Sequence, residues 1–172
     1  MKRSELTSLP EYFDRYILKC DDVTIKEALA LTILELDNAP LDKWRALGTR
    51  TYAEGKWTIK EILQHLIDTE RVFAYRALAF ARGETAKLPS FDENSYAKNS
   101  DANHRSLEDL IAELRHSHQG ILLMYNSFTP EMLERKGMGW TGEYSVAAIG
   151  FTLAGHQRWH FGILEERYYE IM

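Results

Sequence analysis

Residues 145–164, SVAAIGFTLAGHQRWHFGIL, decide the fold of this chain. Their apolar positions recur every three or four residues, which is the period of an amphipathic α-helix. His156 and His160 complete the same stripe, because residues four apart lie one above the other on a helix face. Two imidazole rings in an apolar stripe cost free energy unless a partner holds them. A divalent metal is the simplest such partner, and His65, in another helical segment, is its candidate third ligand.

Composition indicates a single soluble domain spanning residues 1–172. The chain has 172 residues, 45% of them hydrophobic and 27% charged, which suits one packed core. A net charge of −5 without a basic cluster argues against nucleic acid as a partner. The longest apolar run, residues 146–155, is too short to span a membrane, and no signal peptide is expected. Cys20 is the only cysteine, so we expect a reducing, cytoplasmic location.

The tetrapeptide Thr-Ile-Lys-Glu occurs twice, at residues 24–27 and 58–61, and each copy has the pattern of a capping box. The first copy predicts a helix that continues to a break at Pro40. The second opens the longest predicted helix, which ends at Gly83. Because the sequences around the two copies differ, they indicate shared capping chemistry rather than a duplication.

The remaining segments complete an all-α pattern. Ser8 and Pro10 predict a short N-terminal helix to about Leu18, and Ser106 caps a third long helix that reaches residue 125. The last helix runs from Ser145 to about residue 168. A single turn is expected at residues 129–130, and residues 136–144, with three glycines, are expected to form a loop. No alternating pattern predicts a sheet of any size, so we expect a four-helix bundle.

The connection between the second and third long helices, residues 83–105, is long enough to return along the whole bundle. Helix rise supports the same topology. His65 lies roughly 10 Å from the start of its helix, and His160 roughly 12 Å from the end of the last helix. The three histidines therefore lie at the most similar level along the bundle axis when these two helices are antiparallel. The result is an up-down-down-up bundle with a long crossover.

Residues 55–71, GKWTIKEILQHLIDTER, and 155–160, GHQRWH, resemble the two metal-histidine segments of the DinB/YfiT-like superfamily. Residues 81–83 and 91–96 are similar to the crossover of its YfiT-like members. The resemblance covers most of the chain from the second helix onward. It implies an up-down-down-up bundle, commonly a homodimer, with one divalent metal on three histidines. By position these are His65, His156 and His160. One departure is His118, where an arginine is expected.

Other residues are candidates for supporting roles. His118 belongs to an inward stripe but lies roughly 9 Å from the level of His65, so it is expected in the core or lining the pocket rather than as a ligand. Asp68, one turn from His65, can accept a hydrogen bond from its second ring nitrogen. Tyr96 and Asp92, on the crossover, are expected to line the pocket. The tryptophans expected in the core or at the pocket rim are Trp57, Trp140 and Trp159.

Three neutral histidines leave a coordination position open, which is typical of catalytic metal sites. Gln157 stands where the zincin motif requires a glutamate, so this is not a zincin. The resemblance implies a metal-dependent hydrolase or an S-transferase that uses a low-molecular-weight thiol such as bacillithiol. We predict a thiol S-transferase that acts on small electrophiles in detoxification, with Zn, Ni, Mn or Fe as the metal. The alternatives are a hydrolase of a small amide or ester, and a non-catalytic protein with a structural metal.

Overall fold

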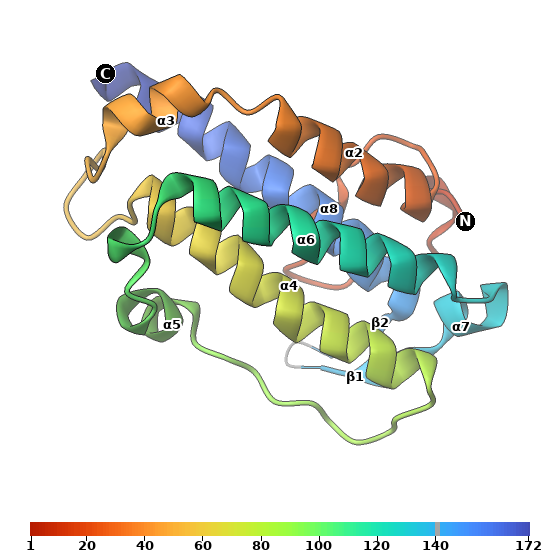
Figure 1. Ribbon diagram of the computed structural model, residues 1–172. Coiled ribbons are helices and arrows are strands. Elements are labelled where there is room, and N and C mark those ends of the chain that lie inside the picture. Colours follow the sequence, from red (N-terminus) through yellow and green to blue (C-terminus); the bar gives the residue numbers. More distant parts are fainter. Residues whose placement is uncertain (140–141) are drawn as a thin grey trace.

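A computed structural model describes residues 1–139 and 142–172 of the chain. Four long helices form a bundle: α2 (Ile25–Asp37), α4 (Ile59–Ala81), α6 (Leu107–Asn126) and α8 (Val146–Ile163). Helices α2 and α8 run in one direction, and α4 and α6 run in the other (Figure 1). Each helix packs against two neighbours, in the order α2, α6, α4, α8 around the bundle. The predicted up-down-down-up bundle is therefore confirmed.

Both predicted capping boxes form. The Thr24 hydroxyl accepts from the backbone N–H of Glu27, and the Glu27 carboxylate accepts from the Thr24 N–H at 2.8 Å. Thr58 and Glu61 repeat this arrangement at the start of α4, with a distance of 2.7 Å from the Thr58 N–H to the carboxylate. Such caps are each worth about 1 kcal/mol. They set the start of α2 and of α4, and thereby the height of His65 in the bundle.

Several shorter helical elements surround the bundle. In the described part of the chain they are η1 (Arg3–Glu5), α1 (Asp14–Ile17), α3 (Leu41–Leu47), α5 (Glu93–Asn99), η2 (Ala102–His104), α7 (Pro130–Glu134), the π-helical η3 (Leu164–Tyr168) and η4 (Tyr169–Ile171). The N-terminal helix is shorter than predicted. Tyr12 has a φ of 74°, which a right-handed helix does not admit, so α1 starts only at Asp14.

The expectation that residues 136–144 form a loop is wrong. Strands β1 (Lys136–Met138) and β2 (Glu143–Ser145) pair antiparallel, with Gly137 opposite Tyr144. Strands of three residues are too short to produce an alternating pattern. The Tyr144 ring is buried and packs edge-on against Phe80 of α4, which fixes the ribbon to the bundle. The expectation for Trp140 lies outside the described residues.

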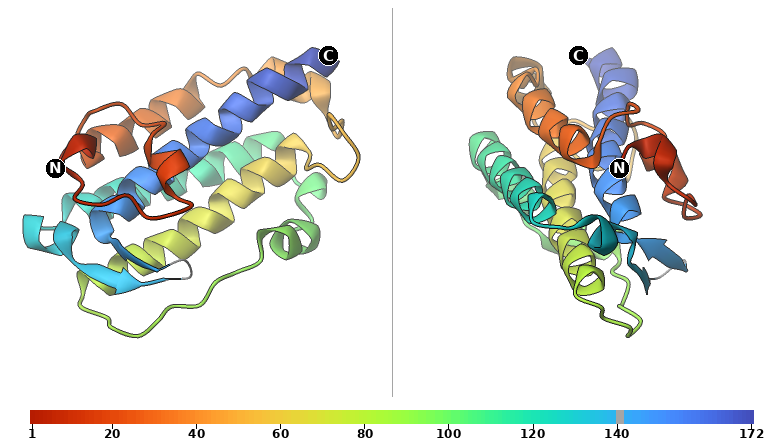
Figure 2. Two further views of the ribbon diagram at one scale, coloured as in Figure 1. Left: turned by 180° about the vertical axis from the view of Figure 1, so that it is seen from behind. Right: turned by 90° about the vertical axis from the view of Figure 1, so that its right-hand side faces the viewer.

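The crossover from α4 to α6 returns along the bundle and carries α5 partway (Figure 2). The bundle core consists of two apolar clusters, one toward each end. Each long helix has buried polar side chains where its sequence passes from one cluster to the other, and on α4 the buried His65 lies one turn before them. Together these residues are Thr32, His65, Thr69, Glu70, His118, His156 and Gln157. We call these seven residues the polar layer. No described helix has the length and apolar character needed to cross a membrane.

Candidate metal centre

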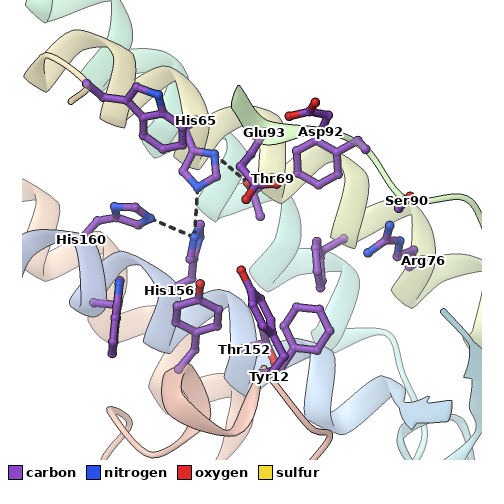
Figure 3. Close-up of a pocket in the computed structure, with 16 residues that line it drawn as sticks. Tyr12, His65, Thr69, Arg76, Ser90, Asp92, Glu93, Thr152, His156 and His160 are labelled. Atoms are coloured by element: carbon purple, nitrogen blue, oxygen red, sulfur yellow. Dashed lines mark hydrogen bonds between the residues drawn. The ribbon is translucent and has the colours of Figure 1, made fainter. Parts of the chain in front are cut away.

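The structure brings together the three histidines that helical spacing singled out. His65 comes from α4, and His156 and His160 come from successive turns of the antiparallel α8. One nitrogen from each ring lies within 4.8 Å of the other two. The His156 Nε2 atom lies 3.2 Å from Nε2 of His65 and 3.1 Å from Nε2 of His160 (Figure 3). We call this group the histidine cluster.

Aromatic rings pack against the histidine cluster and shield it in part from water. Trp57 lies against His65 with ring centroids 4.7 Å apart, and Tyr16 packs edge-on against His156 at 4.9 Å. Burial lowers the pKa of His65 to about 4. Burial, with the His65 charge adding to it, lowers the pKa of His160 to about 3, and the pKa of His156 falls well below its usual value through burial and the two neighbouring rings. The rings are therefore neutral at pH 7, which is the state that binds metals.

The donor set fits a divalent metal. An imidazole nitrogen has one hydrogen-bonding site, occupied by a proton or by a lone pair. His156 Nε2 therefore cannot satisfy both of the ring nitrogens beside it. A cation between the three lone pairs would satisfy all of them. Metal–nitrogen bonds of about 2.0–2.1 Å place ligand nitrogens about 2.9–3.4 Å apart for angles between 90° and tetrahedral, and the two observed separations fall in this range.

The Asp68 carboxylate, expected to orient His65, belongs to a different set of contacts. It accepts a hydrogen bond from Gln64 Nε2 at 2.9 Å, and Gln64 Oε1 in turn accepts from Arg105 at 2.8 Å. The group beside His65 Nδ1 is instead the Thr69 hydroxyl, at 3.5 Å. The reason is geometric: Thr69, at i+4, shares the inward face of α4 with His65, whereas Asp68, at i+3, lies at the edge of that face.

His118, expected in the core or lining the pocket, is buried in the core and is not among the residues that line the cavity beside the histidine cluster. Its Nδ1 lies 2.5 Å from Glu70 Oε1, and its Nε2 lies 2.7 Å from Gln157 Oε1. Both neighbouring atoms are acceptors, so both ring nitrogens donate. Burial disfavours the charged ring, but the Glu70 carboxylate and the two hydrogen bonds outweigh it and raise the pKa of His118. His118 therefore contributes to the polar layer rather than to the metal site.

A cavity of about 370 Å³ adjoins the histidine cluster. One wall is the α4 face that carries His65 and Thr69, followed one and two turns later by Phe73 and Arg76. Asp92 lines the cavity, and its carboxylate also caps α5 by accepting from two backbone N–H groups. Tyr96 is not among the lining residues, because its ring is half exposed and packs on Phe91 at the surface.

Two charged residues of this cavity, Arg76 and Glu93, are not among the site residues expected from the sequence. A signal existed for Arg76, since residues 65, 69, 73 and 76 follow one face of a helix. Glu93 had no such signal. It reaches the cavity from the crossover, whose path the sequence pattern does not predict.

The fold and the histidine cluster define a class of proteins: up-down-down-up helical bundles with three converging histidines in their middle. A family model described as the DinB superfamily matches residues 13–164. The chain belongs to the DinB superfamily.

Two further comparisons agree with this assignment. The chain is 28% identical over 138 residues to "Putative metal-dependent hydrolase OB0413" of Oceanobacillus iheyensis, a match that covers 80% of this chain and 75% of that protein. Its fold is similar to that of YfiT from Bacillus subtilis, described as "a probable metal-dependent hydrolase with an unusual four-helix bundle topology". That match has a TM-score of 0.71 at 15% sequence identity, and it covers 96% of this chain and 91% of YfiT.

Proposed function

We propose that this protein binds one divalent metal through His65, His156 and His160 and catalyses the transfer of a small thiol to an electrophile. The observation that carries the proposal is the convergence of three neutral imidazole nitrogens beside a cavity large enough for a small molecule. Three protein ligands leave a coordination position free, as catalytic sites require. A divalent metal bound there would supply Lewis acidity and lower the pKa of a coordinated thiol or water.

The nucleophile must come from outside the protein. Cys20 is the only cysteine, and its thiol donates a hydrogen bond to the Phe151 carbonyl at 3.3 Å. Burial raises the pKa of Cys20 to about 12, so the thiol stays protonated. Cys20 does not line the cavity. An exogenous thiol, activated as its thiolate, fills this role in the proposed reaction.

The reaction suits the cavity. Phe13, Tyr16, Phe73 and Phe91 give it a largely aromatic lining, which accepts an apolar electrophile. With a halogenated aromatic compound as the electrophile, the thiol proton leaves to solvent and the sulfur forms a bond to carbon. The carbon–halogen bond breaks, and its electron pair leaves with the halide. No residue needs to protonate the halide.

Hydrolysis of a small ester or amide is the second candidate, and one observation favours it. The Glu93 side chain lines the cavity near the histidine cluster, where a carboxylate can take a proton from an attacking water (Figure 3). The names of the two similar proteins point to the same reaction class. Hydrolysis adds water across the scissile bond, so its products, an acid and an alcohol or amine, differ from a thioether.

The test compares two histidine variants. Protein reconstituted with Zn, Ni or Mn is mixed with a small thiol and 1-chloro-2,4-dinitrobenzene, and in parallel with p-nitrophenyl acetate, and the products are identified by mass spectrometry. His160→Ala should abolish turnover and lower metal content. His116→Ala is the matched control, because His116 lies exposed on α6 and its Nδ1 donates to the Ala112 carbonyl of the same helix.

The outcomes separate the candidates. A thioether that requires His160 supports thiol transfer, and acid and alcohol that require His160 support hydrolysis. Unchanged turnover in His160→Ala would refute metal catalysis at this site. Bound metal that stabilises the protein without any turnover would favour a non-catalytic role. The cytoplasmic location and the homodimer stay predictions.

A further inference from the structure

Arg76 is a buried cation that has no carboxylate partner among the described residues. Only 3% of its surface is exposed. Its guanidinium donates to the Pro89 carbonyl at 2.7 Å and lies 4.6 Å from the centre of the Phe73 ring. Both of these neighbours are uncharged. Within residues 1–139 and 142–172, no carboxylate forms an ion pair with it.

An uncompensated buried charge is costly, and Arg76 keeps its charge at any physiological pH. The Pro89 carbonyl, the Phe73 ring and the nearby Tyr144 hydroxyl offset part of this cost, but none of them supplies a negative charge. Asp92 and Glu93 line the same cavity, but neither forms an ion pair with Arg76. The Asp92 carboxylate accepts instead from the backbone of Asn94 and Ser95. An anion that enters the cavity is the natural counterion.

The position of Arg76 sets the shape of such a ligand. Arg76 lies three helical turns beyond His65 on the same face of α4, which is roughly 16 Å along the helix axis. Both side chains line the same cavity, and helical side chains in general tilt toward the N-terminus of their helix, which for Arg76 is the direction of His65. Figure 3 shows the histidine cluster at one end of the cavity and Arg76 at the other. Phe73 lies between them on α4.

We propose that Arg76 binds a carboxylate group of the substrate or thiol, and that it selects for elongated ligands with an acid at one end and the reacting group at the other. The proposal rests on the proposed function for the reacting end of the ligand. Carboxylate is favoured over a point-like anion because a guanidinium can donate two parallel hydrogen bonds to it. The aromatic middle of the cavity accepts the chain between the two ends.

Calorimetric titrations with matched acids and amides test this inference. Metal-loaded protein is titrated with 6-mercaptohexanoate and with 6-mercaptohexanamide, and metal-free protein with hexanoate and hexanamide. Wild type should prefer each acid on the order of tenfold, the worth of a charge-assisted hydrogen bond. Arg76→Gln should remove this preference and leave the affinity for the amides unchanged. Arg82→Gln, an exposed arginine of the same helix end, is the control that should keep it.

Circular dichroism and thermal unfolding establish that Arg76→Gln is folded. Equal affinity of the wild type for acids and amides would overturn the inference, whether or not the variant folds. An acid preference that survives in folded Arg76→Gln would also overturn it, and would leave Arg76 as a residue that fixes the crossover through Pro89. The titration of metal-free protein does not depend on metal or on turnover. An acid preference without turnover would therefore contradict the proposed function but not this inference. Turnover without an acid preference would contradict this inference and leave the proposed function intact.

Discussion

Replacing Gly155 by alanine should destabilise the protein, although alanine is the better helix former. Gly155 lies on α8 directly before His156, where α1 crosses the helix. A Cβ atom added there would lie 1.8 Å from the Tyr16 carbonyl oxygen and 2.5 Å from its carbon. These are backbone atoms, so no side-chain rotation relieves the contact. The whole of α1 would have to move.

The magnitude follows from two opposing effects. Replacing a glycine inside a helix by alanine gains up to about 1 kcal/mol. Overpacking that forces a backbone shift costs about 1–3 kcal/mol, and here the contact is far below van der Waals distance. We therefore expect a net loss of about 1–2 kcal/mol in the free energy of unfolding. Because the Tyr16 ring packs on His156, the shift of α1 should also weaken metal binding.

Gly162 provides a matched control on the same helix. An added Cβ at Gly162 meets no atom within 4 Å, so Gly162→Ala should stabilise the protein by up to about 1 kcal/mol. Urea unfolding of the metal-free wild type and both variants measures the three free energies. The opposite signs of the two substitutions are the expected result. A Gly155→Ala variant as stable as the wild type would refute the packing of α1 against α8.

Three further predictions concern ionisation and metal. Saturation with Zn at 100 times its Kd should raise the free energy of unfolding by about 2.7 kcal/mol, and His156→Ala should abolish this gain in thermal unfolding. Burial lowers the pKa values of the histidine cluster, so the unfolded chain takes up protons there at a higher pH than the folded protein, and acid favours unfolding. The free energy of unfolding of the metal-free protein should therefore fall as pH falls from about 6.5 toward 4. Urea unfolding measured across this range tests this, and a profile that stays flat would contradict it. Glu70→Gln should lower the pKa of His118, measured by NMR, because the neighbouring negative charge is gone.

Sequence alone predicts the long helices well, because their ends carry local signals. Thr24 and Thr58 cap α2 and α4 through hydrogen bonds to residues three positions later, so four consecutive residues contain the whole signal. The histidine cluster was predictable for a related reason. The i, i+4 pair on α8 is local, and the height of His65 follows from the regular rise of α4.

The remaining features depend on contacts between distant residues. Tyr144 is held in the short β-ribbon by Phe13 and Phe80, which lie far away in the sequence. Asp68 and Thr69 lie three and four residues after His65, within one helical turn of it, and the way α4 packs against α8 decides which of them faces the ring. Glu93 reaches the cavity through the path of the crossover, which no periodicity encodes.

The polar layer explains why the histidine cluster forms before any metal arrives. The Gln157 side chain donates to the Thr32 carbonyl of α2 at 2.9 Å and accepts from His118 of α6, which in turn donates to Glu70 of α4. One chain of hydrogen bonds thus joins all four long helices. A one-turn slip of α8 would move His156 by about 5.4 Å and break both Gln157 hydrogen bonds, at a cost of about 1–3 kcal/mol for each buried polar group left without a partner. Apolar contacts alone would resist such a slip less, because they are not directional. Since Gln157 directly follows His156, the residue that sets the register of α8 also sets the height of the metal ligands.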